Sequence, residues 1–158
     1  MKELILVRHG HALDGTPDFD RQLSHTGVHA VNQLAYEVSK HIGQVDKVIA
    51  SPAARTKQTA YILSEHWKIN SSNISWQEEV YEASLDTLKE ILNQIPGTAN
   101  RVLLVGHNPG LSLLVHYLTG AVCHLEPSSL VHIKLYVDEW MLITQNSGSL
   151  MATHFPTL

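Results

Sequence analysis

Short apolar runs alternate along the chain with longer segments whose apolar residues recur every three or four positions. The runs are typical of buried strands and the longer segments of amphipathic helices, and their alternation predicts an α/β domain. The expected strands are residues 3–8, 45–50, 74–76, 101–106, 129–137, 139–145 and 150–154. A tight turn at Asp138 and Glu139 would join the fifth and sixth of these strands.

The first expected helix has a recognisable signal at each end. It should begin after Ser24, a residue type that caps helix N-termini, and end at Gly43, a residue type that often follows the last helical turn. Its apolar stripe comprises Val28, Val31, Ala35, Val38 and Ile42. The spacing of three and four residues within this stripe predicts one buried helix face.

Two further helices should begin with a cap residue followed by proline, which loses no hydrogen bond at the first helical position. Ser51 and Pro52 form the first such pair, and Asn108 and Pro109 form the second. Between them, residues 85–95 predict another amphipathic helix.

Composition and charge limit the class of protein. The chain has 158 residues and neither a linker nor a low-complexity tract, so we expect residues 1–158 to form one domain. A net charge of −4 argues against nonspecific nucleic-acid binding, which needs an excess of Lys and Arg. No apolar run approaches the length of a membrane span, and we expect no membrane partner.

The expected location follows from the amino terminus and the single thiol. The first strand begins almost at residue 1, which leaves no room for a signal peptide. Cys123 is the only cysteine in the sequence, so no intramolecular disulfide is possible, as is usual in a reducing compartment. We therefore expect a cytoplasmic protein. The sequence gives no indication of its oligomeric state.

Charged and imidazole side chains stand at three places where an expected strand ends. Arg8 and His9 follow the first strand, His107 follows the strand at 101–106, and Arg55 falls in the first helical turn after Ser51. Parallel strands would bring these three exits to one sheet edge, where helix N-termini favour an anion. Arg55 opposes the macrodipole of its helix, and a bound dianion would remove that conflict.

Each of these residues also has a structural interpretation. His9 could act as a nucleophile that accepts a phosphoryl group, or it could hold a loop by a hydrogen bond at the strand end. His107 could be a phosphate ligand, a proton donor or a structural loop residue. Arg55 could pair with a carboxylate on the surface. Arg21, in the polar loop after the first strand, could add a third cation. The joint placement favours a phosphoryl pocket.

A metal site is the main competing hypothesis, since the chain has 11 histidines. His25 and His29 are four residues apart on an expected helix and could share a metal. However, the chain has no HExxH motif, and its lone thiol provides no cysteine framework. We therefore expect solvated histidines and no metal.

Four segments, in this order along the chain, resemble the motifs of one protein family. They are Leu6-Val7-Arg8-His9-Gly10, Arg21-Gln22-Leu23-Ser24 with Gly27, Ser51-Pro52-Ala53-Ala54-Arg55-Thr56-Lys57-Gln58-Thr59, and Gly106-His107-Asn108-Pro109. The chain resembles the histidine phosphatase superfamily, or phosphoglycerate-mutase-like proteins, and within it the small bacterial phosphohistidine phosphatases of the SixA type. The resemblance implies a single histidine-phosphatase domain over residues 1–158.

The resemblance also carries expectations for the fold and the site. It implies three α/β/α layers around a mostly parallel sheet with one antiparallel strand. It implies that His9 is the phosphorylated residue and that Arg8, Arg55 and His107 surround the phosphate. Arg21 matches an arginine of the small members, where it would add a further phosphate contact. The resemblance implies no metal and no organic cofactor.

The larger members of this family carry an acidic residue as general acid on an inserted segment between the second and third motifs. Here that region offers Glu78, Glu79 and Glu82 without a long insertion. Glu82 is the best candidate, although a solvated loop carboxylate is the better expectation. An imidazole leaving group, with a pKa of about 6.5, needs such an acid far less than an alkoxide does.

We therefore expect a phosphatase that takes phosphoryl groups from phosphohistidine in a partner protein, as in phosphorelay or phosphotransferase systems. The first alternative is a phosphatase for small phosphomonoesters that uses the same covalent step. The second is a phosphoprotein-binding module without catalysis, which would have no use for a nucleophile at His9.

Overall fold

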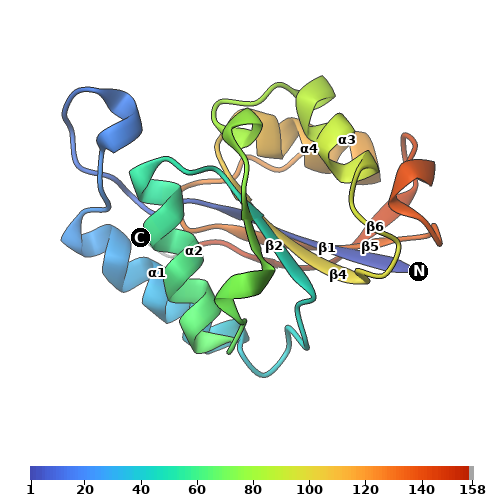
Figure 1. Ribbon diagram of the computed structural model, residues 1–158, viewed down its shortest axis with the longest axis horizontal. Helices are drawn as coiled ribbons and strands as arrows, with labels where there is room; N and C mark the ends of the chain where they lie inside the picture. Colours follow the sequence, from blue (N-terminus) through green and yellow to red (C-terminus); the bar gives the residue numbers. More distant parts are fainter. Residues whose placement is uncertain (157–158) are drawn as a thin grey trace.

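The computed structural model describes residues 1–156, in which one six-stranded sheet is built from widely separated segments (Figure 1). The strands are β1 (Lys2–Arg8), β2 (Lys47–Ala50), β3 (Ile74–Trp76), β4 (Arg101–Gly106), β5 (Leu130–Leu135) and β6 (Gly148–His154). Their order across the sheet is β3-β2-β4-β1-β5-β6. The first four strands are mutually parallel, β5 is antiparallel to β1, and β6 is antiparallel to β5. One strand therefore opposes the other five, as expected.

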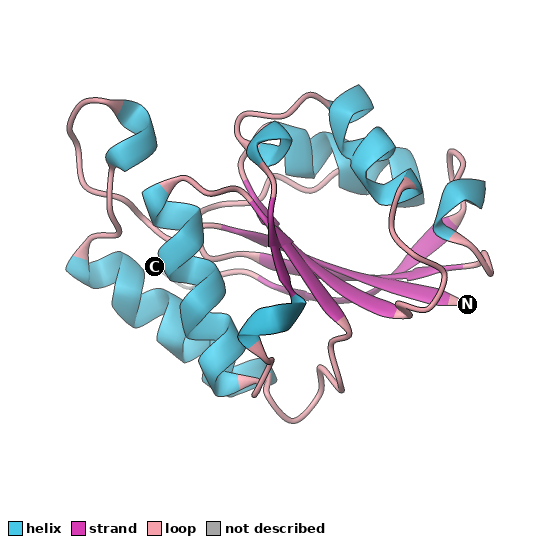
Figure 2. Ribbon diagram, viewed as in Figure 1, coloured by secondary structure: helices cyan, strands magenta, loops and turns pink. Residues whose placement is uncertain are grey.

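Helices cover both faces of this sheet (Figures 1 and 2). They are α1 (His25–Val38), α2 (Ala54–His66), α3 (Leu85–Asn93) and α4 (Gly110–Thr119). The pair α1 and α2 packs on one face and the pair α3 and α4 on the other, which confirms the three-layer α/β/α fold. Within residues 1–156, no helix is both long and apolar enough to span a membrane.

The buried strands are apolar on both faces because each face has its own core. In β1, Leu4 and Leu6 belong to the core beneath α3 and α4. Ile5 and Val7 point the other way and belong to the core beneath α1 and α2. Successive strand residues face opposite sides, so a strand between two helical layers must be a continuous apolar run.

Helix α1 begins where the sequence predicts and ends earlier. The Oγ of Ser24 accepts a hydrogen bond from the backbone N–H of Gly27 at 3.0 Å, which confirms the predicted cap. The helix ends at Val38 instead of Gly43. Val28 is 37% exposed and does not belong to the buried stripe. Gly27 takes the inner position because its Cα packs so closely on His11 that a Cβ would lie 2.1 Å from the His11 carbonyl oxygen.

The two helices with predicted cap–proline starts begin slightly later than expected. Helix α2 starts at Ala54, because the Ser51 Oγ accepts the N–H of Ala53 at 3.2 Å and closes a turn before the helix. Helix α4 starts at Gly110. Asn108 still serves this helix, because its Oδ1 accepts the N–H of Ser112 at 3.2 Å.

The predicted strand at 139–145 is wrong, and this segment instead contains the 3₁₀-helix η4 (Trp140–Leu142). Trp140 is fully buried in the core beneath α3 and α4, and its Nε1 donates to the Ala99 carbonyl at 2.7 Å. Anchoring this large side chain away from the sheet prevents the segment from pairing with β5. Strand β6 takes that place at the sheet edge.

Candidate active site

His9, Arg55 and His107 lie together at the carboxyl end of the parallel strands. His9 directly follows β1, His107 directly follows β4, and Arg55 is in the first turn of α2, which follows β2. The two imidazole ring centroids are 5.2 Å apart. The exposed fractions are 8% for His9, 5% for Arg55 and 6% for His107, so the cluster is shielded from water.

The hydrogen bond of the His9 ring defines which nitrogen is free. Its Nδ1 lies 2.7 Å from the Gly10 carbonyl oxygen. A carbonyl can only accept, so Nδ1 carries the proton and the neutral ring keeps a lone pair on Nε2. Burial, together with the charges of Arg55 and Arg8, lowers the pKa of His9 to about 4, although the hydrogen bond to the Gly10 carbonyl acts in the opposite direction. At neutral pH the ring is therefore neutral, and its unprotonated Nε2 could act as a nucleophile.

Two edges of the Arg55 guanidinium have different partners. On one edge, Nε lies 3.4 Å from His9 Nε2, and Nη2 lies 3.5 Å from His107 Nδ1. On the other edge, Nη1 donates to the Asp18 carbonyl at 2.8 Å, and Nη2 donates to Asp18 Oδ2 at 3.0 Å. The guanidinium thus faces both imidazoles while a loop residue holds its far side.

His107 has the opposite proton arrangement from His9. A guanidinium only donates, so His107 Nδ1 accepts from Arg55 and the proton is on Nε2. Burial, together with the charges of His9 and Arg55, lowers the pKa of His107 to about 3, although the Asp18 carboxylate acts in the opposite direction. Within residues 1–156, neither Nε2 of His107 nor Nε of Arg8 has a hydrogen-bond partner, although both are buried. Both atoms are donors that an oxyanion could satisfy.

Arg8 is anchored beside the cluster by backbone groups. Its Nη1 donates to the Leu125 carbonyl at 2.8 Å, and Asn108 Nδ2 donates to the same carbonyl at 2.9 Å. Burial lowers the pKa of Arg8, Glu126 raises it, and Arg55 lowers it again. Arg8 and Arg55 are therefore two cations whose charges repel each other.

Arg21 is connected to Arg55 through Asp18, to which both arginines donate hydrogen bonds. Its Nε donates to the Leu13 carbonyl at 2.7 Å, and its Nη1 donates to Asp18 Oδ1 at 2.9 Å. Its charge contributes to the low pKa of His9. The contacts of Arg21 therefore stabilise the loop, and a direct phosphate contact by this residue stays a prediction.

Asp18 and Tyr81 belong to this site, and sequence reasoning did not single them out. Asp18 lies in the 3₁₀-helix η1 (Asp18–Asp20), on the loop that extends from β1 before the chain enters α1 (Figure 1). The Tyr81 hydroxyl donates to Asp18 Oδ2, and Arg21 and Arg55 also donate to this carboxylate. These hydrogen bonds, with that of Tyr81 the strongest, hold the pKa of Asp18 well below its usual range.

The segment after β3 contributes its tyrosine to the site instead of a glutamate. The Tyr81 ring packs edge-on against His107, with centroids 5.3 Å apart. Glu82 is exposed on a left-handed backbone turn with a φ of 50°. Glu78 and Glu79 are exposed and line a hollow beside α3, together with Thr87 and Glu90. Sequence could have indicated only that this segment lies near the pocket, since no local pattern distinguishes Tyr81.

The two candidate metal ligands lie elsewhere. His25 and His29 are both exposed on the first turns of α1. Across residues 1–156, no three His, Cys, Asp or Glu side chains are grouped as ligands of a metal ion would be.

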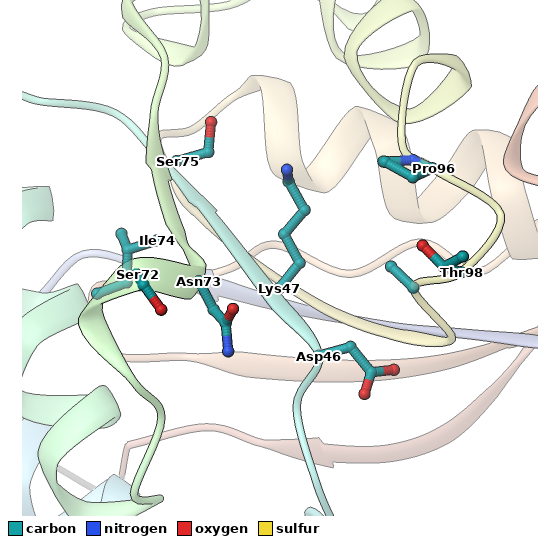
Figure 3. A pocket seen from close by; sticks show the side chains of 9 residues that line it. Asp46, Lys47, Ser72, Asn73, Ile74, Ser75, Pro96 and Thr98 are labelled. Carbon is teal, nitrogen blue, oxygen red and sulfur yellow. The ribbon is translucent and has the colours of Figure 1, made fainter.

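A cavity of about 270 Å³ lies at the opposite end of the parallel strands (Figure 3). It is lined by Asp46 and Lys47 at the start of β2, by Ile74 at the start of β3, and by Pro96 and Thr98 before β4. Because the His9 cluster follows the carboxyl ends of β1 and β4, the two sites are on different edges of the sheet.

The cluster has the parts that phosphoryl transfer requires. His9 Nε2 offers a lone pair, and the adjacent edge of Arg55 can hold the oxygens of a phosphoryl group. Arg8 and His107 add buried donors. Fixed donors in a water-poor pocket stabilise charge that develops in a transition state.

The chain is similar to several known proteins. The fold matches the protein designated phosphohistidine phosphatase SixA of Nakamurella multipartitia with a TM-score of 0.88 and 25% identity, covering 99% of this chain and 97% of that one. It also matches a protein histidine phosphatase SixA complexed with tungstate, with a TM-score of 0.82, 20% identity and coverage of 96% and 95%. An uncharacterised Mycobacterium leprae protein is 24% identical over 152 residues, or 90% of this chain and 91% of its own length.

The model of one protein family matches residues 4–85. The matched range includes Arg8, His9 and Arg55, and also the loop that carries Asp18 and Arg21. The chain therefore belongs to the histidine phosphatase superfamily (branch 1) and is a phosphatase.

Proposed function

We propose that the chain removes phosphoryl groups from phosphohistidine in a partner protein, and that His9 carries the phosphoryl group between two steps. One observation carries the proposal. The unprotonated Nε2 of His9 faces a guanidinium edge of Arg55 beside a second buried imidazole, that of His107. The proposal treats residues 1–158 as one histidine-phosphatase domain.

In the first step, the lone pair of His9 Nε2 attacks phosphorus. A bond between Nε2 and phosphorus forms while the bond between phosphorus and the substrate nitrogen breaks. The electron pair of that bond stays on the substrate imidazole, which takes a proton from solvent. Arg8, Arg55 and the Nε2–H of His107 would hold the charge that is spread over the phosphoryl oxygens.

In the second step, a water oxygen attacks the same phosphorus atom. The bond between phosphorus and His9 Nε2 breaks, its electron pair returns to Nε2, and inorganic phosphate leaves. The Gly10 carbonyl keeps the proton on Nδ1 in both steps, so the ring presents the same nitrogen throughout. Gly10 is itself held, because its N–H donates to Thr59 Oγ1 at 3.1 Å.

The choice of a phosphohistidine substrate rests on the acids around the site. Among residues 1–156, the carboxylate that contacts the cluster is Asp18, which is ion-paired and therefore deprotonated. Glu78, Glu79 and Glu82 are exposed. Imidazole departs without a positioned acid far more readily than an alkoxide does. The names of the two similar solved structures support the same substrate class.

A direct comparison of substrates tests the proposal. The enzyme is assayed with a purified phosphotransfer protein carrying radiolabelled phosphohistidine, and with alkyl and aryl phosphate esters. We expect kcat/KM for phosphohistidine to exceed that for alkyl esters by about a hundredfold or more, because a general acid is worth about 100-fold to 10,000-fold to an alkoxide. Alkyl esters that react as fast as the phosphoprotein would instead assign the chain to small phosphomonoesters.

A further inference from the structure

We propose that Asp18 is a positioning residue, which holds one edge of the Arg55 guanidinium so that its other edge faces the two histidines. The inference deepens the proposed function and rests on it, because it assigns the orienting group of the arginine that would bind the phosphoryl oxygens. It concerns a residue of the loop after β1, outside the strand ends that supply the other groups.

The contacts of Arg55 divide into two sets. The edge made by Nη1 and Nη2 donates to the backbone carbonyl and to the carboxylate of Asp18, at 2.8 and 3.0 Å. The edge made by Nε and Nη2 faces His9 and His107 at 3.4 and 3.5 Å. Asp18 thus occupies the side of Arg55 that a phosphoryl group between the histidines would not use.

Asp18 is itself held by two further residues, one at the end of its own 3₁₀-helix and one after β3. Arg21 donates to Oδ1 at 2.9 Å, and the Tyr81 hydroxyl donates to Oδ2. The Tyr81 ring also lies 5.9 Å from the Arg55 guanidinium carbon, so it packs near both partners. Three donors on one carboxylate fix its orientation, and a fixed carboxylate can fix an arginine.

Arg55 needs such an anchor for two physical reasons. It is a cation in the first turn of α2, where the positive end of the helix dipole repels it. Its side chain also loses rotamer entropy when it is immobilised. The Asp18 charge offsets the first effect, and its bidentate contact selects one rotamer before the substrate arrives.

Two other roles for Asp18 fit the contacts less well. A carboxylate that blocks the phosphate site would contact the edge of Arg55 that faces the histidines, and Asp18 contacts the adjacent edge, made by Nη1 and Nη2. A general acid would need a proton at neutral pH, and Asp18 accepts hydrogen bonds from two arginines and a tyrosine. The experiment below distinguishes positioning from blocking.

A double-mutant cycle tests the proposal, with Asp18→Ala made in wild type and in Arg55→Lys and assayed with p-nitrophenyl phosphate. In wild type we expect Asp18→Ala to lower kcat about tenfold to a hundredfold, which is the range typical for groups that orient a contacting residue. KM should change much less. In Arg55→Lys, Asp18→Ala should cause little further loss. Asp18→Asn keeps one acceptor oxygen and should restore part of the rate. Asp20→Ala, at an exposed residue of the same 3₁₀-helix, is the matched control.

If Asp18→Ala lowered kcat by the same factor in wild type and in Arg55→Lys, the proposal would be overturned, because Asp18 would then act independently of Arg55. A gain in rate and in vanadate affinity for Asp18→Asn would also overturn it and would indicate blocking. Thermal unfolding shows whether each variant is folded. If Asp18→Ala does not fold, Tyr81→Phe provides the test, because it removes the hydroxyl on Asp18 and keeps the ring. Tyr81→Phe should lower kcat in wild type and have little effect on kcat in Arg55→Lys. An equal decrease in both backgrounds would overturn the proposal.

The cycle does not depend on the natural substrate, since an aryl phosphate is the probe. Failure of phosphohistidine proteins as substrates would overturn the proposed substrate and leave the coupling between Asp18 and Arg55 measurable. Conversely, additive losses with p-nitrophenyl phosphate would reject the positioning role even if phosphohistidine is the preferred substrate.

Discussion

Nε of Arg55 lies 3.4 Å from Nε2 of His9, the nitrogen that the Gly10 carbonyl leaves unprotonated. A cation next to this lone pair opposes protonation of the ring, and burial opposes it further. The same guanidinium could hold the oxygens of a phosphoryl group as its phosphorus approaches Nε2. In the proposed mechanism, this one contact connects the availability of the His9 lone pair with the binding of the phosphoryl group.

Replacement of His9 by alanine should abolish turnover and leave the fold and some phosphate binding intact. The reason is that no bond to phosphorus can form without Nε2. Quenching wild type during turnover and mapping the label should locate acid-labile phosphate on His9. His29→Ala, at an exposed histidine of α1, is the control and should retain full activity. Label on another residue, or substantial turnover by His9→Ala, would refute the assignment.

Arg55→Lys should lower kcat by about a hundredfold to a thousandfold, the usual loss for one preorganised donor. Lysine keeps the charge but lacks the planar fork that faces both histidines and Asp18. Steady-state kinetics with an aryl phosphate measures the effect. Lys57→Ala, at an exposed residue of the same helical turn, should be near wild type. Near-normal kinetics for Arg55→Lys would mean that Arg55 is structural.

Acid should destabilise the fold as the pH falls below about 6.5, the ordinary pKa of histidine. In the folded chain the pKa values of His9 and His107 are lowered to about 4 and about 3. Below 6.5 the unfolded chain therefore binds protons that the folded chain does not, and stability is lost until the pH passes the folded values. Each histidine should contribute on the order of 1–2 kcal/mol near pH 5.

Urea unfolding of wild type and His9→Asn at several pH values measures this effect. The variant should lose less free energy of unfolding than wild type between about pH 7.5 and about pH 5, because it lacks one of the two histidines whose pKa is lowered in the folded chain. His25→Asn, at an exposed position, should follow the wild-type curve. Parallel curves for wild type and His9→Asn would show that His9 titrates normally in the folded chain.

Replacement of Glu78, Glu79 and Glu82 by glutamine, singly and together, should leave phosphohistidine hydrolysis nearly unchanged. All three side chains are exposed, and Tyr81 is the residue of this segment that packs on His107. The measurement is kcat/KM across a series of leaving groups for wild type and the triple variant. Wild type should depend steeply on the leaving group. A shallow dependence that steepens when one glutamate is lost would reveal a general acid.

The sequence alone determined the order of the α-helices and strands through β5 and the positions of His9, Arg55 and His107 just after strands. These features depend on local patterns, because a buried strand between two helical layers has to be continuously apolar. Parallel neighbours then place the exits at one edge, so the meeting of these three residues follows from the order of strands. The predicted start of α2 was less accurate, because Ser51 closes a turn before the helix and the helix begins only at Ala54.

The tertiary structure alone decided which loop residues complete the site and which segments leave the sheet. Asp18 and Tyr81 are 63 residues apart, and neither has a local pattern that marks it. Asp14, Asp18 and Asp20 are three acids within the same short stretch of sequence, and only contacts with Arg55, Arg21 and Tyr81 distinguish Asp18 from the other two. Trp140 likewise leaves the predicted strand because its partner, the Ala99 carbonyl, lies 41 residues away. Contacts between distant segments form only when the packed layers bring them together, which periodicity along the chain does not encode.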